Sequence, residues 1–150
     1  MELGFRIAVI FVTALMGCGK PQPDAEFKAH VALLQRNNTN HLFAPISYDI
    51  RKTDSLISPF MGEIEWSEAN AKDYAEGEAN HWVFVWSRRL TLAYQEHRWI
   101  LKKTEEKLDL FKKETDASTW KLTKAPSEWS DWTEGQMIYG RMLGLYEPRN

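Results

Sequence analysis

The chain has 150 residues, a formal net charge of −2 at neutral pH and a single cysteine. This length suits one domain with a substantial core and is too short for two. The small net charge gives no electrostatic reason to expect a nucleic acid or an anionic membrane surface as a partner. A lone cysteine excludes intrachain disulfides, so the core must stabilise the fold without covalent cross-links.

Residues 1–17 have the three parts of a secretory signal. Arg6 lies in a short N-terminal region, an uncharged, mainly apolar run follows from Ile7 to Leu15, and the small residue Gly17 stands before Cys18. The run has about half of the roughly 20 residues that a membrane-spanning helix needs. We therefore expect a cleaved signal peptide, in preference to a transmembrane helix or a buried N-terminal helix.

The segment Leu15-Met16-Gly17-Cys18 resembles the lipobox of bacterial lipoproteins, with Leu three residues before the cysteine and a small residue one before it. Met16 departs from the Ala, Ser or Thr usual in that family. The resemblance implies that diacylglycerol is attached to the Cys18 thiol, that the signal is cut between Gly17 and Cys18, and that the new N-terminus is acylated, for example with palmitate. Gly19 stands where an Asp would imply retention in the inner membrane. In a Gram-negative host, this favours the outer membrane.

The chain is thus predicted to have three parts. These are a signal peptide at 1–17, a lipidated cysteine with a short proline-containing tether at 18–23, and one globular domain at 24–150. The membrane is the expected partner of the lipid anchor, and the short tether would keep the domain close to it.

Periodicity predicts the elements of the domain. Phe27, Val31 and Leu34 recur at i, i+4 and i+7 and predict an amphipathic helix over 24–36. Alternating apolar and polar residues predict strands at 46–51, 60–66, 82–94 and 120–124. Gly62 suits a β-bulge within the second of these strands.

Three further segments are less regular. Residues 67–80 lose the alternation and predict a loop, and Gln95 to Arg98 suits a hairpin turn. Residues 102–113 are rich in Lys, Glu and Leu, which favours a helix, but pairing with the preceding strand favours a strand. We predict a strand through about Glu106. Apolar residues at helical spacing follow over 138–145.

A helix followed by several strands predicts an α+β fold, with the N-terminal amphipathic helix packed on an antiparallel sheet of about four to five strands. This layout resembles the cystatin-like and nuclear-transport-factor-like folds. Residues 51–60 also resemble a segment of small exported bacterial proteins of unknown activity, so this second resemblance implies no activity.

Motifs for catalysis are missing from the sequence. The four histidines, at 30, 41, 81 and 97, lack metal-ligand spacing, and there is no glycine-rich phosphate loop or GxSxG motif. We therefore predict no cofactor, no metal site and no enzymatic activity. Glu63 and Glu65 would share a strand face and leave a carboxylate-dependent hydrolase as an alternative, although a solvated strand face is the simpler explanation.

Trp129, Trp132 and Arg88 are candidate ligand-binding residues. The two tryptophans lie outside the clear strands, and their rings can stack on sugars or peptides. Arg88 interrupts an apolar strand face, and a buried guanidinium needs a carboxylate or several carbonyl partners. Arg88 therefore marks either a place where the strand bulges or leaves the core, which is the simpler explanation, or an anion-binding site.

The predicted function is therefore a membrane-anchored lipoprotein whose domain is a non-enzymatic binding or envelope-associated module. Its partner would be an envelope protein or a small ligand. The alternative is a small-ligand or carbohydrate-binding protein that uses exposed tryptophans.

Overall fold

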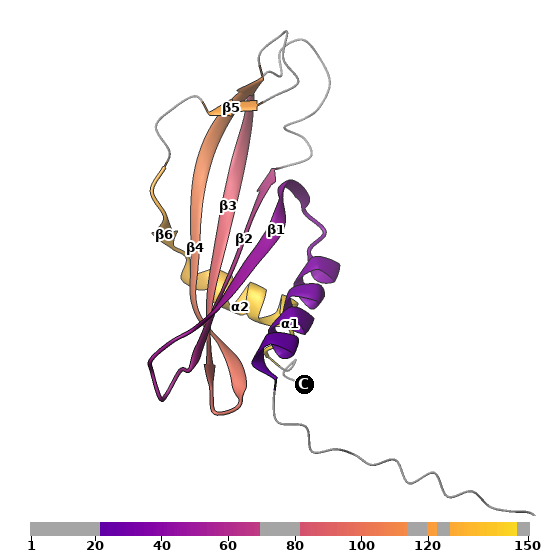
Figure 1. Ribbon diagram of the computed structural model, residues 1–150. Helices are drawn as coiled ribbons and strands as arrows, with labels where there is room; N and C mark the ends of the chain where they lie inside the picture. Colours follow the sequence, from indigo (N-terminus) through magenta and orange to yellow (C-terminus); the bar gives the residue numbers. More distant parts are fainter. Residues whose placement is uncertain (1–21, 70–81, 114–119, 123–126, 147–150) are drawn as a thin grey trace, which may run out of the picture.

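A computed structural model describes residues 22–69, 82–113, 120–122 and 127–146. In chain order, these residues form α1 (Pro23–Asn37), β1 (His41–Lys52), β2 (Phe60–Ala69), β3 (Trp82–Gln95), β4 (Arg98–Lys113), β5 (Trp120–Leu122), β6 (Ser130–Asp131) and α2 (Thr133–Met142) (Figure 1).

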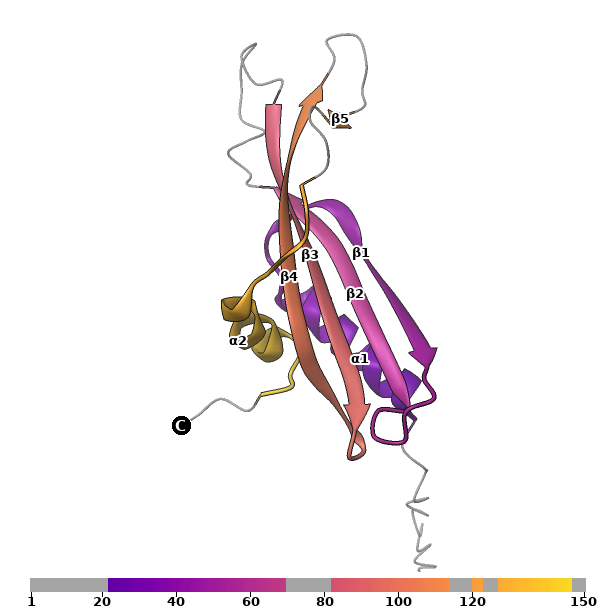
Figure 2. The same ribbon diagram turned by 90° about the vertical axis from the view of Figure 1, so that its left-hand side faces the viewer.

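One antiparallel sheet contains all of these strands. Its order is β1-β2-β3-β4-β5, and the short β6 also pairs with β4. With 14 and 16 residues, β3 and β4 exceed the usual strand length of about 3–10 residues. Strands of this length twist strongly, and the sheet curls along its length (Figure 2).

The predicted fold class is wrong. We expected an N-terminal amphipathic helix packed on an antiparallel sheet of about four to five strands, but the described residues form a curled sheet of six strands with two helices. Sheet pairing therefore dominates the architecture, and the resemblance to cystatin-like and nuclear-transport-factor-like layouts is withdrawn. The second helix, α2, was difficult to predict from the sequence because it contains Gly135 and Gly140, which weaken its helical signal.

Pairing also extends the strands beyond their predicted ends. The strand predicted in 102–113 is confirmed, and it continues through Lys113 because its residues pair with β3 along nearly the whole of that strand. This pairing outweighs the helix propensity of its Lys and Glu residues. β1 begins at His41, and β2 continues to Ala69 into the predicted loop.

Two local predictions had different outcomes. The hairpin turn between β3 and β4 is confirmed, with φ angles of 49° at Glu96 and 61° at His97, as a two-residue type I′ turn requires. The bulge at Gly62 is wrong, because Gly62 pairs in regular register with Ile50 and Leu92. A Cβ atom there would lie 2.1 Å from the ring of Phe27, so glycine makes room for α1 on the sheet.

Both helices pack on one face of the sheet, which we call the helix-side face. The helix-side core is a buried cluster of residues from α1, β2, β3, β4 and α2. It comprises Phe27, Val31, Leu34, Ile64, Trp66, Leu90, Leu92, Tyr94, Trp99, Leu101, Tyr139 and Leu143. The helices also contact each other directly, since His30 Nδ1 lies 2.7 Å from the carbonyl oxygen of Leu143.

A second, smaller cluster lies on the opposite face of the sheet. This opposite-face core consists of buried Ala69, Val83 and Val85, with Phe43, Phe111 and Trp120 packed against it. We call the end of the sheet that carries β5 the upper end and the end with the β3–β4 turn the lower end. The upper parts of β3 and β4 extend beyond both helices (Figure 1).

Candidate functional site

β3 changes its buried face at Ser87 and Arg88. Upstream, Val83 and Val85 are buried on the opposite face, whereas downstream Leu90 and Leu92 are buried on the helix-side face. Because the helices cover only the lower part of the sheet, the alternation of buried and exposed residues reverses where their cover ends. Two features follow from this reversal: a buried arginine at the boundary and a row of exposed aromatic residues above it.

The buried arginine is Arg88, which lies between two carboxylates on neighbouring strands. Its Nε atom lies 3.2 Å from Glu68 Oε1 on β2, and its guanidinium is ion-paired with Glu106 on β4. Glu68 accepts two further hydrogen bonds, from Trp66 Nε1 at 3.2 Å and from Asn40 Nδ2 at 2.9 Å. This network satisfies the buried charge, as a guanidinium in a core requires.

Aromatic side chains enclose the same guanidinium. Its central carbon lies 4.3 Å from the ring centroid of Trp132 and 5.1 Å from that of Trp86. Both distances are within the range of cation–π interactions. Burial raises the pKa of the nearby Tyr139 hydroxyl far above its usual range, and the negative charge of Glu68 adds to this shift. The hydroxyl is therefore neutral at physiological pH.

Of the two alternatives for Arg88, the structure favours the one in which β3 leaves the helix-side core at this residue, because the buried face of the strand changes at Ser87 and Arg88. A bulge at this position is wrong, because Arg88 pairs regularly with Trp66 and Glu106, and the irregularity in the β3–β4 ladder lies between Thr91 and Leu92. An anion site is not favoured either, since two carboxylates already face one guanidinium. The geometry indicates a charged cluster that joins β2, β3 and β4.

Trp129 and Trp132 lie on opposite faces of the sheet. The short strand β6 between them pairs with β4, and Trp132 N donates to Thr104 O at 2.8 Å. The guanidinium carbon of Arg89 lies 4.0 Å from the ring centroid of Trp129, whereas Trp132 stacks on the guanidinium of Arg88. Both tryptophans are half-buried. They therefore pack on opposite faces near the edge of the sheet and do not form one shared binding face.

Above Arg88, three aromatic residues are exposed on the helix-side face. Trp82, Phe84 and Trp86 are 46%, 52% and 36% exposed, respectively. Leu108, which pairs with Trp86, is 37% exposed and continues the apolar surface onto β4. We call Trp82, Phe84, Trp86 and Leu108 the aromatic row.

The sequence pattern alone does not reveal the aromatic row, because alternation over 82–94 puts its three rings on the same strand face as Leu90 and Leu92. A signal was present: Val83 and Val85 make the other face of the same segment equally apolar. In a sheet with only one covered face, a strand that is apolar on both faces must expose one of them.

The two candidate catalytic glutamates share the opposite face of β2. Glu63 and Glu65 line a shallow hollow with Ser47, Tyr48 and Asp49. Their side chains are 43% and 42% exposed, and Arg89 lies 4.0 Å from Glu63 and 3.1 Å from Glu65. A general acid requires a desolvated carboxyl group with a raised pKa, whereas these carboxylates are solvated and share an arginine.

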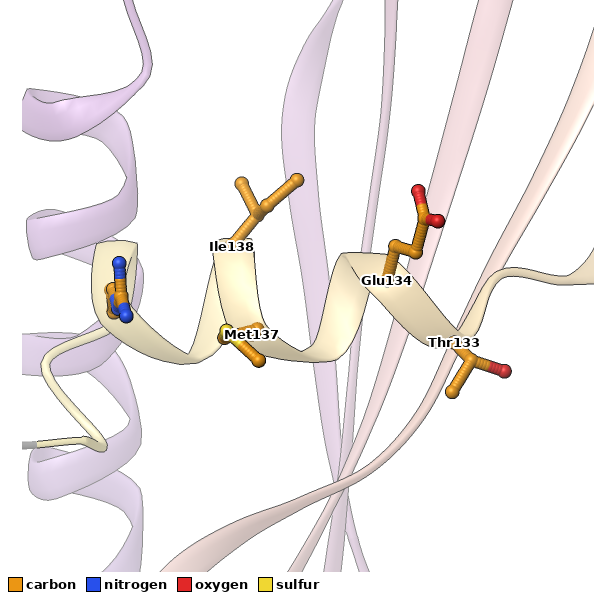
Figure 3. Close-up of a pocket in the computed structure, with 5 residues that line it drawn as sticks. Thr133, Glu134, Met137 and Ile138 are labelled. Atoms are coloured by element: carbon orange, nitrogen blue, oxygen red, sulfur yellow. The ribbon is translucent and has the colours of Figure 1, made fainter.

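A second shallow groove, of about 430 Å³, runs along the exposed side of α2 (Figure 3). It is lined by Thr133, Glu134, Met137, Ile138 and Arg141, and Figure 3 shows Thr133 and Glu134 near the start of the helix with Met137 and Ile138 farther along it. Met137 is 62% exposed and Ile138 is 44% exposed. All five residues come from a single helix, so the groove has no second wall among the described residues.

Within the described ranges, no group of three or more His, Cys, Asp or Glu residues is arranged to hold a metal ion. Neither α1 nor α2 has the length and apolar character that a membrane crossing needs. Gly17 and Cys18 lie outside the described residues. Comparison with protein-family models, curated proteins and solved structures gives no match.

Proposed function

We propose that the chain is a bacterial lipoprotein, anchored through Cys18, whose domain is a non-enzymatic binding or envelope-associated module. The lipobox resemblance of Leu15-Met16-Gly17-Cys18 supports the anchor. The observation that carries the binding role is the aromatic row, because Trp82, Phe84 and Trp86 expose large apolar rings side by side on one strand. Contiguous apolar surface of this kind is typical of interaction sites.

The anchor is tested by replacing Cys18 with serine in cells supplied with labelled palmitate. We expect the wild-type protein to take up the label and to sediment with membranes. The Cys18→Ser variant should lose the label and leave the membrane fraction, because a hydroxyl is too weak a nucleophile for thioether chemistry. Wild-type protein without label, or a variant that stays on membranes unchanged, would refute the anchor.

The binding role is tested by site-specific photocrosslinking in the native envelope. A photoreactive phenylalanine analogue replaces Phe84 in the aromatic row, and the matched control places it at Met137, which is also exposed but lies on α2. We expect a defined adduct from position 84 and none from position 137. Equal labelling at both positions, or none at position 84, would contradict an envelope-protein partner on the aromatic row.

Carbohydrate binding is the second candidate. The aromatic row spans about 13 Å along the strand at roughly 3.3 Å per residue, so successive sugar rings could stack on it. If it does bind sugar, Trp86→Ala should abolish binding to an oligosaccharide array, whereas Trp129→Ala should leave it unchanged, because Trp129 faces the other side of the sheet and stacks on Arg89.

A further inference from the structure

The loop between β1 and β2 exposes two large aliphatic side chains at its tip. Leu56 is 100% exposed and Ile57 is 76% exposed, more than any other large apolar side chain among the described residues. Neither side chain belongs to either core. The loop therefore presents two adjacent apolar groups that the domain itself does not use.

Hydrogen bonds inside the loop hold this tip in place. Thr53 N donates to Pro59 O at 3.0 Å, Ser55 N to Thr53 Oγ1 at 3.2 Å and Ser58 N to Ser55 Oγ at 3.1 Å. Gln95 on β3 also donates to the Ser58 hydroxyl and ties the loop to the neighbouring hairpin. Polar groups of Thr53, Ser55 and Ser58 are thus paired, while the side chains of Leu56 and Ile57 are exposed.

The loop lies at the same end of the domain as the start of α1. Trp99 Nε1 donates to Pro23 O at 2.9 Å, and the ring of Trp99 packs against Tyr94 at 5.3 Å. Tyr94 in turn contacts Phe60, the first residue after the loop, at 6.1 Å. Both views place the β1–β2 loop, the β3–β4 turn and the beginning of α1 at the lower end (Figures 1 and 2).

The length of chain between Cys18 and Pro23 limits how far the anchor can lie from this end of the domain. Cys18 precedes Pro23 by five residues, and five extended residues span at most about 18 Å. A lipid attached at Cys18 would bring the lower end of the domain to the bilayer surface, and the attachment raises the local concentration of lipid around the loop.

We propose that Leu56 and Ile57 insert into the headgroup–acyl boundary of the bilayer that holds the lipid anchor. This inference rests on the proposed lipidation of Cys18. Burial of apolar side chains in the interface is favourable without any specific contact. Lys52 and Asp54 flank the tip with opposite charges, so insertion is expected to depend on apolar burial and to persist in added salt.

Insertion also orients the domain. With the lower end in contact with the bilayer, the upper end and its aromatic row face away from the lipid. Two contacts, the anchor and the loop, would restrict rotation about the tether in a way that one contact cannot.

The test uses the processed, lipidated protein reconstituted in phosphatidylcholine vesicles. Because the lipid consumes the Cys18 thiol, an Asp54→Cys substitution provides a single thiol for an environment-sensitive fluorophore beside the tip. The comparison is the same reporter in a Leu56→Ser/Ile57→Ser background. Leu122→Cys, a 38% exposed position on β5 at the upper end, is the positional control.

We expect the reporter at position 54 to shift to shorter wavelength and to be quenched by doxyl-labelled lipid. Both effects should be lost in the double-serine background and absent at position 122. A reporter at position 54 that stays in water, or one that responds equally in both backgrounds, overturns the insertion while sedimentation with vesicles still supports the anchor. Protein with a free Cys18 thiol that does not sediment with vesicles overturns the anchor, and the inference with it.

Discussion

Arg88 and Arg89 have the same side chain, but their positions on β3 give them different burial and different ion-pair partners. They are neighbours on β3, so their side chains point to opposite faces of the sheet. The Arg88 side chain is only 11% exposed and pairs with Glu68 and Glu106, whereas the Arg89 side chain is 27% exposed and pairs with two half-exposed glutamates. Each arginine also lies over a tryptophan ring.

Replacing Arg88 with methionine should destabilise the protein strongly. The substitution leaves Glu68 and Glu106 without their cation in a region shielded from water, and breaking a buried pair in this way costs about 3–5 kcal/mol. The matched change, Arg89→Met, should cost about 1 kcal/mol or less, because its partners are solvated. The measurement is the free energy of unfolding in denaturant for both variants.

A triple variant separates lost charge from lost packing. Glu68→Gln and Glu106→Gln, added to Arg88→Met, remove the uncompensated charges and should recover part of the lost stability. Equal, small losses for Arg88→Met and Arg89→Met would show that the Arg88 cluster is not an energetic unit of the fold.

At the scale of elements, the sequence predicts where alternation begins more reliably than where pairing ends. The periodicity of Phe27, Val31 and Leu34 locates the residues of α1 that are buried, and the alternation after Trp82 locates β3. The extents of β2 and β4 depend on their partner strands, which lie far away in sequence. No local pattern contains that information.

The candidate site was hidden for the same reason. Glu68, a partner of Arg88, lies in a segment that loses alternation, and Trp132 reaches Arg88 only because β6 pairs with β4. The sequence did indicate that a buried arginine must have a carboxylate partner. It could not indicate which carboxylate, because strand order and register decide that.

Gly62 provides a test of how α1 docks on the sheet. Alanine at this position would bring its Cβ within 2.1 Å of Phe27, a ring that is fully buried between α1 and β2. We expect Gly62→Ala to lower the free energy of unfolding by about 1–3 kcal/mol through overpacking. Thermal unfolding followed by circular dichroism would measure the loss.

The control for Gly62→Ala is a double variant with Phe27→Leu, which makes room for the new methyl group. The two changes should be less destabilising together than the sum of their separate effects, because residues in contact do not act additively. Strict additivity would mean that α1 does not approach β2 as closely as the structure indicates.

Across the whole molecule, two clusters of unequal size stabilise the two ends of one sheet. Among the residues that the structure describes, the helix-side core contains 12 buried residues and receives both helices, whereas the opposite-face core contains three. β3 and β4 run through both regions. Their upper and lower halves therefore pack against cores of different size, although each strand is continuous. Local stability follows the density of buried contacts, and the upper half should therefore open without global unfolding.

Amide hydrogen exchange would reveal this difference. We expect the amides of residues 83–87 to exchange through local opening, and those of residues 90–94 to exchange only on global unfolding. Val85→Ala removes about two methylene equivalents from the smaller core, or roughly 1.6 kcal/mol, which corresponds to about 15-fold faster exchange in the upper half. Leu92→Ala, in the larger core, should cost about 2–5 kcal/mol and accelerate exchange in both halves. If Val85→Ala accelerates both halves equally, the sheet unfolds as one cooperative unit and the two cores do not define separate regions of stability.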